Sequence, residues 1–225
     1  LGLEWEHAWN LTTHTCAYTN HTILAEALEK WPIDILKPVL PRVYQIIEEI
    51  NRRFCRELIE LKYPQDKVTK MAIISDGRIH MAHLAIVGSF SVNGVAQLHT
   101  DILKNIEMKE FNMLYPNKFN NKTNGITHRR WLLHTNPELS EIISTVSDNW
   151  VKDPNELENL MKKVNNKNYR KLVKEVKIAK KNQLADRIKK EQNIELDPNS
   201  IFDIQVKRLH EYKRQLMNAL HIMYV

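Results

Sequence analysis

The sequence predicts an α/β protein that is mostly helical. Apolar residues at 43–61 recur with helical spacing, and an apolar run at 201–206 leads into a basic segment with helical character. The composition agrees, because only 5 of 225 residues are glycine while 43% are hydrophobic and 27% are charged. These observations predict a soluble globular chain with many helices and few strands.

The N-terminal half contains the clearest helix. Prolines at 32, 38 and 41 punctuate the chain before it, and Tyr63-Pro64 ends it. Its apolar stripe comprises positions 43, 46, 47, 50, 54, 58 and 61, with charged residues opposite. A short strand or helix at 71–75 is expected next, followed by a turn at Asp76-Gly77 and a buried helix or strand at 81–91.

The C-terminal half is predicted from similar signals. A loop at 115–127 contains Asn124-Gly125, a dipeptide that favours positive φ and a tight turn. Helices are expected at 95–106, 131–145 and 155–192, a turn at 197–200, a strand at 201–206 and a helix from about 208 onward. The Asn-rich loop at 117–124 is the predicted domain boundary, which divides the chain into 1–123 and 124–225.

The two ends of the sequence resemble cuts. There is no initiator methionine, and the last segment runs to Val225 without a helix stop signal. No signal peptide is visible, and no apolar run approaches the ~20 residues needed to cross a bilayer. The sequence therefore predicts an interior piece of a soluble protein with no membrane partner.

Positive charge is concentrated in one segment. Residues 162–191 contain 12 lysines and arginines and 3 acids, a net charge of +9 that leaves −3 for the rest of the +6 chain. A solvated outer helix face explains this charge. A nucleic-acid surface is the alternative, although Tyr169 is the only aromatic residue available for stacking.

Other polar residues favour structural roles over catalysis. Cys16 and Cys55 are too few for a disulfide framework and predict reduced thiols. His80 and His83 share a helical spacing, but no third ligand completes a metal site. No nucleophile elbow, Walker loop, dinucleotide fingerprint or distinctive carboxylate pair is present.

The segment 201–214 is the best candidate for anion binding. Lys207 and Arg208 follow the expected strand, and Lys213 lies a few residues later. In an open parallel sheet, ligands bind beyond the carboxyl ends of strands, where Lys and Arg are natural phosphate partners. A charged helix that pairs Lys207 and Arg208 with Glu211 explains the same pattern.

His21 is a candidate for sugar binding. It lies in a polar loop near Tyr18 and Trp31, where sugar hydroxyls are typically held. A histidine in such a loop also serves as a structural hydrogen-bonding residue, and the pattern leaves both readings open.

Five segments together resemble the α-glucan (glycogen and starch) phosphorylases, in that family's order and over nearly the whole chain. The matching residues are Cys16-Ala-Tyr-Thr-Asn-His-Thr22, Glu26-Ala-Leu-Glu-Lys-Trp-Pro32, Met81-Ala-His-Leu84 with Val92-Asn-Gly-Val-Ala96, Asn121-Lys-Thr-Asn-Gly-Ile-Thr127 with Arg129-Arg-Trp131, and Gln205-Val-Lys-Arg-Leu-His-Glu-Tyr-Lys-Arg-Gln215.

The resemblance implies a glycosyltransferase-B architecture, in which two Rossmann-like lobes enclose the active site. Residues 1–123 would then end the N-terminal lobe and 124–225 would begin the C-terminal, cofactor-binding lobe. The implied reaction is reversible phosphorolysis of an α-1,4-glucan by inorganic phosphate to give glucose 1-phosphate. The implied cofactor is pyridoxal phosphate, which participates through its phosphate. The implied parent is a cytoplasmic homodimer with no nucleic-acid partner.

The resemblance also implies site residues. His21 is similar to the histidine that holds the reacting glucosyl unit, and Asn124 and Tyr212 are similar to sugar contacts. Arg208 resembles the arginine that binds substrate phosphate. Lys213 resembles the lysine shared between the substrate and cofactor phosphates, and Lys207 a cofactor-phosphate ligand.

Departures from the family pattern limit these implications. The lysine that forms the Schiff base is expected beyond Val225, so the fragment alone is expected to be inactive. His128 replaces a usual proline and Phe90 a common histidine. A non-catalytic glucan-binding protein and a basic helical nucleic-acid-binding module are the alternatives.

Overall fold

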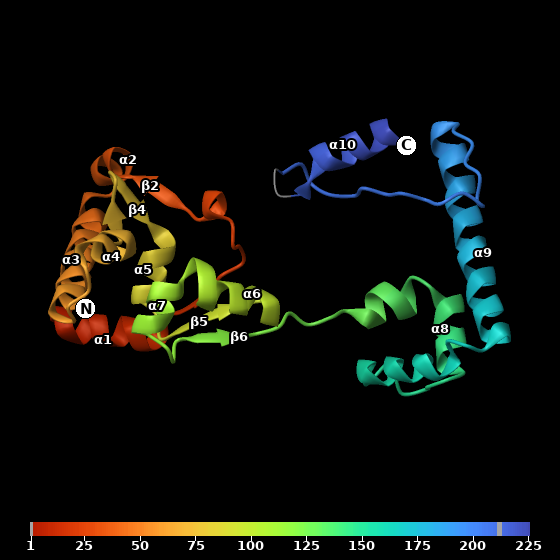
Figure 1. Ribbon diagram of the computed structural model, residues 1–225, viewed down its shortest axis with the longest axis horizontal. Helices are drawn as coiled ribbons and strands as arrows, with labels where there is room; N and C mark the ends of the chain where they lie inside the picture. The colour runs from red at the N-terminus through yellow and green to blue at the C-terminus, as the bar shows by residue number, and fades with distance from the viewer. Residues whose placement is uncertain (1, 211–212) are drawn as a thin grey trace. The chain divides into compact units, whose positions relative to one another are not determined.

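The computed structural model describes residues 2–210 and 213–225. The chain divides into two compact units, Leu1–Gly125 and Ile126–Val225 (Figure 1). Each unit has its own secondary structure and is described separately below.

The first unit contains two small sheets surrounded by helices. Strands β1 (Ala17–Thr19), β5 (Ser91–Gly94) and β6 (Phe119–Asn121) form a parallel sheet in the order β1-β5-β6. Strands β2 (Lys30–Pro32), β4 (Arg78–His80) and β3 (Ile74–Ser75) form an antiparallel sheet in the order β2-β4-β3. The helical segments are α1 (Trp5–Thr15), η1 (Ala25–Ala27), α2 (Ile33–Val39), α3 (Pro41–Glu60), α4 (Gln65–Met71), α5 (Met81–Val87), α6 (Gln97–Ile102), η2 (Leu103–Glu107) and α7 (Lys109–Leu114).

Helix α3 provides much of the core of this unit. Its start at Pro41 is favoured because proline has no N–H to leave unpaired in the first turn. The helix predicted at 43–61 is confirmed, but its buried face is rotated from the predicted stripe, since Val43 and Ile46 are exposed. The buried residues of α3 are Tyr44, Ile47, Ile50, Phe54 and Leu58.

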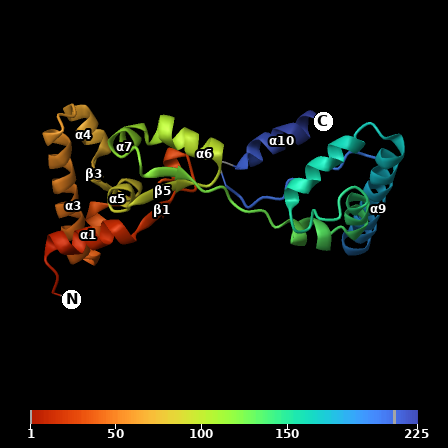
Figure 2. The same ribbon diagram turned by 90° about the horizontal axis from the view of Figure 1, so that it is seen from below.

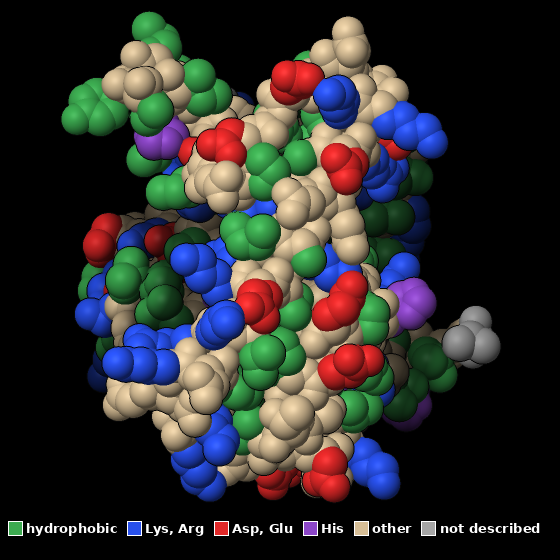
Figure 3. Space-filling model, turned by 90° about the vertical axis from the view of Figure 1, so that its right-hand side faces the viewer, with side chains coloured by type: hydrophobic (Ala, Val, Ile, Leu, Met, Phe, Trp, Pro, Cys, Tyr) green, Lys and Arg blue, Asp and Glu red, His purple; other side chains and the backbone are tan. Residues whose placement is uncertain are grey.

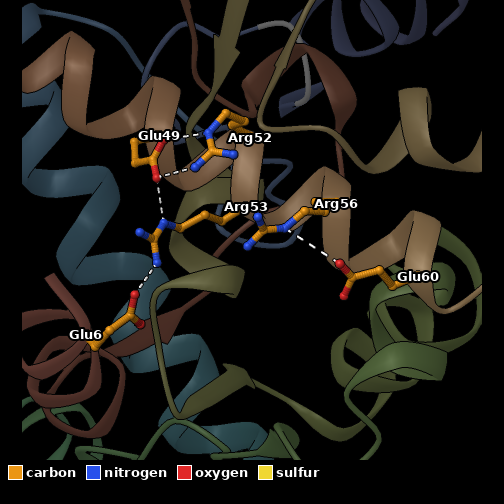
Figure 4. A network of polar contacts seen from close by, with 6 residues as sticks. All are labelled: Glu6, Glu49, Arg52, Arg53, Arg56 and Glu60. Atoms are coloured by element: carbon orange, nitrogen blue, oxygen red, sulfur yellow. Dashed lines mark hydrogen bonds and ion pairs between the residues drawn. The ribbon is translucent and has the colours of Figure 1, made fainter.

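An ion-pair network on the outer side of α3 attaches helix α1 (Figure 4). Glu49 accepts hydrogen bonds from Arg52 Nε at 2.7 Å and from Arg53 Nε at 2.6 Å. Arg53 also pairs with Glu6 of α1 and lies over the ring of Trp5, 4.8 Å from its centroid. Arg52 and then Arg53 lower the pKa of Glu49 to about 2.

The second unit is built on helices. It contains η3 (Arg129–His134), α8 (Pro137–Ser144), η4 (Pro154–Lys163), α9 (Lys167–Gln192) and α10 (Gln215–Tyr224). Asn136 caps α8 by accepting from the Leu139 N–H, and Asn166 caps α9 by accepting from the Tyr169 N–H. Trp150 is fully buried, and its indole N–H donates to Ser144 Oγ at 3.0 Å.

Several predictions hold and several are wrong. The turn at Asp76-Gly77 is confirmed, because both residues have positive φ. The helix predicted over 131–145 is divided at Asn136, since Pro137 has no N–H to continue the preceding helix. The tight turn at Asn124-Gly125 is wrong: neither residue has positive φ, and the Asn124 N–H donates to the Val95 carbonyl at 3.0 Å.

The strand predicted at 201–206 is also wrong. These residues belong to no helix or strand, and Ile201 and Val206 are 95% and 78% exposed. An apolar run becomes a strand only where a neighbour pairs with it, and the described part of the second unit contains no strand. Helix α10 begins at Gln215, so Lys207 and Arg208 precede it and do not form its first turn.

No helix within residues 2–210 and 213–225 is long and apolar enough to cross a membrane.

Candidate functional site

The carboxyl edge of the parallel sheet collects the two predicted sugar-binding residues. His21 follows the end of β1, and Asn124 follows the end of β6. The Asn124 N–H donates to the carbonyl of Val95, which directly follows β5. Because all three strands are parallel, the loops that carry these residues meet at one edge, where ligands bind in open α/β sheets.

The loop after β1 holds one side chain inward and presents the next outward. Asn20 is only 2% exposed, and its N–H donates to the Asn93 carbonyl at 2.9 Å. Its side-chain Oδ1 accepts from the Thr22 N–H at 2.9 Å. His21, between them, is exposed. The loop is thus anchored on both sides of His21, whose imidazole remains accessible.

Helix α6 supplies a residue that the sequence reasoning missed. His99 Nε2 lies 3.1 Å from Asn20 Oδ1, and its Nδ1 accepts from the Val95 N–H at 3.1 Å. His99 and Asn20 are 79 positions apart, so no local spacing could have connected them. The only available signal was that His99 comes shortly after the 92–96 motif.

Gly94 allows α6 to approach the end of β5. A Cβ atom on Gly94 would lie 2.3 Å from Thr100 Oγ1 and 3.0 Å from the Thr100 Cα and N atoms. No side chain fits at that distance without displacing the helix. The absence of a Cβ therefore lets α6 place His99 at the sheet edge.

The predicted phosphate residues lie in the second unit. Lys207 and Lys213 line an open groove of about 550 Å³, but Arg208 does not. The other lining residues are Asp203, Gln205, Arg214, Met217, Asn218 and His221. Arg208 is exposed, and its backbone carbonyl accepts from Gln215 Nε2 at 2.8 Å. Tyr212 and Glu211 lie outside the described residues.

Two polar contacts connect residues that line the groove. Gln205 Nε2 donates to the Lys213 carbonyl at 3.2 Å, and His221 lies 3.0 Å from Asp203. Arg214 takes a left-handed conformation, with φ of 60°, just before α10 begins. The groove gathers two ammonium groups and a guanidinium against one carboxylate, which favours an anionic ligand such as phosphate.

His80 and His83 form a half-buried stacked pair, with ring centroids 4.9 Å apart. His80 Nε2 contacts Ser75 Oγ at 3.0 Å, and His83 Nδ1 donates to the Ala72 carbonyl at 2.9 Å. Burial lowers the pKa of His83 to about 4. No cluster of three potential metal ligands occurs among the described residues.

The basic segment at 162–191 largely coincides with α9, and its charges are partly paired. Lys180 contacts Glu138 at 2.7 Å, and Arg187 contacts Glu191 at 2.9 Å. Basic and acidic side chains are interspersed on the face drawn in Figure 3. Cys16 and Cys55 are free, as predicted.

Comparison with known proteins gives strong matches. A family model described as carbohydrate phosphorylase matches residues 1–225. Glycogen phosphorylase from Bacillus subtilis (strain 168) is 57% identical over 99% of this chain and 28% of its own length. The bovine (Bos taurus) muscle form of glycogen phosphorylase is 48% identical over 98% of this chain and 27% of its own length. Maltodextrin phosphorylase from Streptococcus pneumoniae serotype 4 is 49% identical over 99% of this chain and 29% of its own length. The chain thus spans less than a third of these relatives.

Proposed function

Because the chain belongs to the carbohydrate phosphorylase family, we propose that it is a fragment of an enzyme that cleaves an α-1,4-glucan with inorganic phosphate. The product is glucose 1-phosphate. The single observation that carries this proposal is the 57% identity to a glycogen phosphorylase over 99% of the chain. Relatives named for glycogen and for maltodextrin both match, so either glucan fits the proposal.

The proposed architecture is the two-lobed glycosyltransferase-B fold. Residues 1–123 belong to the N-terminal lobe and 124–225 to the C-terminal lobe. The division into units at Gly125 supports a boundary near this position. The longer parent is proposed to be a cytoplasmic homodimer.

The proposed sugar-binding residues are His21 and Asn124. Both are exposed and follow strands at one edge of the parallel sheet. Neutral hydrogen-bonding groups at such an edge orient the sugar through its hydroxyls and add no positive charge beside a ring that itself becomes positive in the transition state. Tyr212 is proposed as a further sugar contact, because it lies in the segment 205–215 that matches the family motif.

The proposed phosphate-binding residues are Lys207, Arg208 and Lys213. Fixed cations stabilise the attacking phosphate and the charge that it carries in the transition state. Lys207 and Lys213 line the same groove, which supports a shared anion. Arg208 directly follows Lys207 in the sequence and is exposed, and it is not one of the residues that line the groove.

Pyridoxal phosphate is the proposed cofactor. The donor set fits its phosphate group, since Lys207 and Lys213 line a groove that also contains Arg214. When bound, the cofactor supplies chemistry through this phosphate and not through its ring. Lys207 and Lys213 would hold it, and the Schiff-base lysine is proposed to lie elsewhere in the parent.

A nucleic-acid-binding module is the weaker proposal. The basic helix α9 is the feature that favours it. However, Lys180 and Arg187 of this helix pair with acidic side chains, and the family model that matches the whole chain is that of the phosphorylases. We propose no nucleic-acid partner for the parent.

The test is phosphorolysis by the full-length parent, measured as glucose 1-phosphate released from glycogen and from maltodextrin. Arg208→Ala should lower kcat/KM by about 100-fold or more, because it removes a charge that stabilises the transition state. Glucan binding should persist. Arg187→Ala is the matched control, since Arg187 is an exposed arginine of the same unit that pairs with Glu191. Near-normal turnover by Arg208→Ala would contradict its assignment.

A further inference from the structure

A buried hydrogen-bond network supports the loop that carries His21. Asn20 Nδ2 donates to the Tyr18 hydroxyl at 3.1 Å, while its Oδ1 accepts from the Thr22 N–H at 2.9 Å. These two contacts fix the orientation of the amide. The same Oδ1 faces His99 Nε2 at 3.1 Å, so one buried asparagine joins the loop to helix α6.

The contacts of His99 select one form of its ring. The Val95 N–H is a donor, so His99 Nδ1 must carry a lone pair. In a neutral imidazole the proton is then on Nε2, which donates to Asn20 Oδ1. His99 thus contributes one acceptor and one donor, and both are used.

The network connects all three loops at the sheet edge. His99 binds Val95, the residue directly after β5, and the Val95 carbonyl in turn accepts from the Asn124 N–H. Figure 2 shows β1 and β5 side by side with α6 nearby. The loops of His21 and Asn124 are therefore linked through Asn20, His99 and Val95, none of which has to touch a ligand.

We propose that Asn20 and His99 are positioning residues, which hold the His21 loop against the carboxyl edge of the sheet so that the imidazole of His21 is correctly placed for the reacting sugar. The role in catalysis rests on the proposed function. The structural role does not, because it follows from contacts within the first unit alone.

The experiment uses the full-length parent. His99→Ala removes both ring contacts, and Asn20→Ser, made separately, disrupts the same junction from the loop side. His99→Gln is the conservative variant, because a carboxamide offers both an NH2 donor group and a carbonyl acceptor. His83→Ala is the matched control: His83 is a half-buried histidine of the same unit, bonded to a backbone carbonyl away from the sheet edge.

Two readouts separate positioning from general destabilisation. Amide hydrogen exchange at 20–22 should accelerate about tenfold or more in His99→Ala and stay at the wild-type rate in His83→Ala, since only the first loses contacts to this loop. Phosphorolysis by His99→Ala should lose about tenfold or more in kcat with KM little changed, because the misplaced group acts in the transition state. His99→Gln should recover most of this loss.

The proposal is overturned if folded His99→Ala or Asn20→Ser keeps wild-type exchange at 20–22, or if its kcat matches that of His83→Ala. A parent that releases no glucose 1-phosphate even as wild type overturns the proposed function. In that case the exchange measurement alone still decides whether Asn20 and His99 position the loop.

Discussion

Replacing Gly94 by alanine tests the close approach on which the sheet edge depends. The new Cβ would lie 2.3 Å from Thr100 Oγ1 and 3.0 Å from two backbone atoms of Thr100. The hydroxyl can move only by giving up the hydrogen bond of its single proton, which the Ala96 carbonyl and Asn121 Oδ1 share at 3.0 Å each. Overpacking costs roughly 1–3 kcal/mol, and a lost buried hydrogen bond adds about 1 kcal/mol. We expect Gly94→Ala to destabilise the first unit by about 3 kcal/mol.

Thermal unfolding followed by circular dichroism measures this effect. For a unit of this size, a loss of about 3 kcal/mol corresponds to a fall in Tm of roughly 10 °C. Gly125→Ala is the control: no atom lies within 4 Å of its Cβ and its φ is not positive, so its Tm should change by about 2 °C or less. Adding Thr100→Ala to Gly94→Ala should restore only part of the loss, because the backbone contacts remain. If the Tm of Gly94→Ala equals that of Gly125→Ala, the close approach of α6 to Gly94 does not have the predicted cost.

Two further predictions concern ionisable groups. The pKa of His83 is about 4 in the folded chain and about 6.5 when unfolded. Its contribution to stability is therefore present above pH 6.5 and is lost as the pH falls toward 4. Tm measured across this pH range should fall less steeply in His83→Gln than in the wild type. Glu49, whose pKa is about 2, stabilises the α1–α3 contact above its unfolded pKa and loses this effect as the pH falls toward 2. Glu49→Gln should therefore lower Tm at neutral pH and low salt, and the difference should shrink in about 1 M salt, where the screening length is about 3 Å.

Local patterns predicted the parts of the fold that depend on local physics. The helix of Pro41–Glu60 has strong periodicity and a proline start, and the Asp76-Gly77 turn follows from residues that tolerate positive φ. The Asn124-Gly125 turn failed because a tertiary bond, from the Asn124 N–H to the Val95 carbonyl, determines the backbone there. Residue preference could not reveal that partner.

The candidate site divides in the same way. His21 and Asn124 were proposed from family motifs, and the parallel pairing of β1, β5 and β6 places their loops at one edge although they are far apart in the sequence. Asn20 and His99 were missed because their importance depends on a contact across 79 positions. A buried polar residue is identified by its partners, and single-sequence patterns contain no information about partners so distant.

The segment at 201–209 shows why sequence pattern and local structure disagree most where the proposed phosphate residues lie. Ile201 and Val206 are 95% and 78% exposed, although the run from 201 to 206 has the composition of a strand. Strand stability comes from pairing and from burial of both faces, and the described part of the second unit offers no strand for either. If the longer parent forms the proposed C-terminal lobe, neighbouring strands would cover these side chains and convert the run into a strand. Lys207 and Arg208 would then stand at a strand end, as the sequence predicted. The Arg208→Ala test therefore belongs in the full-length parent, where the proposed lobe would be complete.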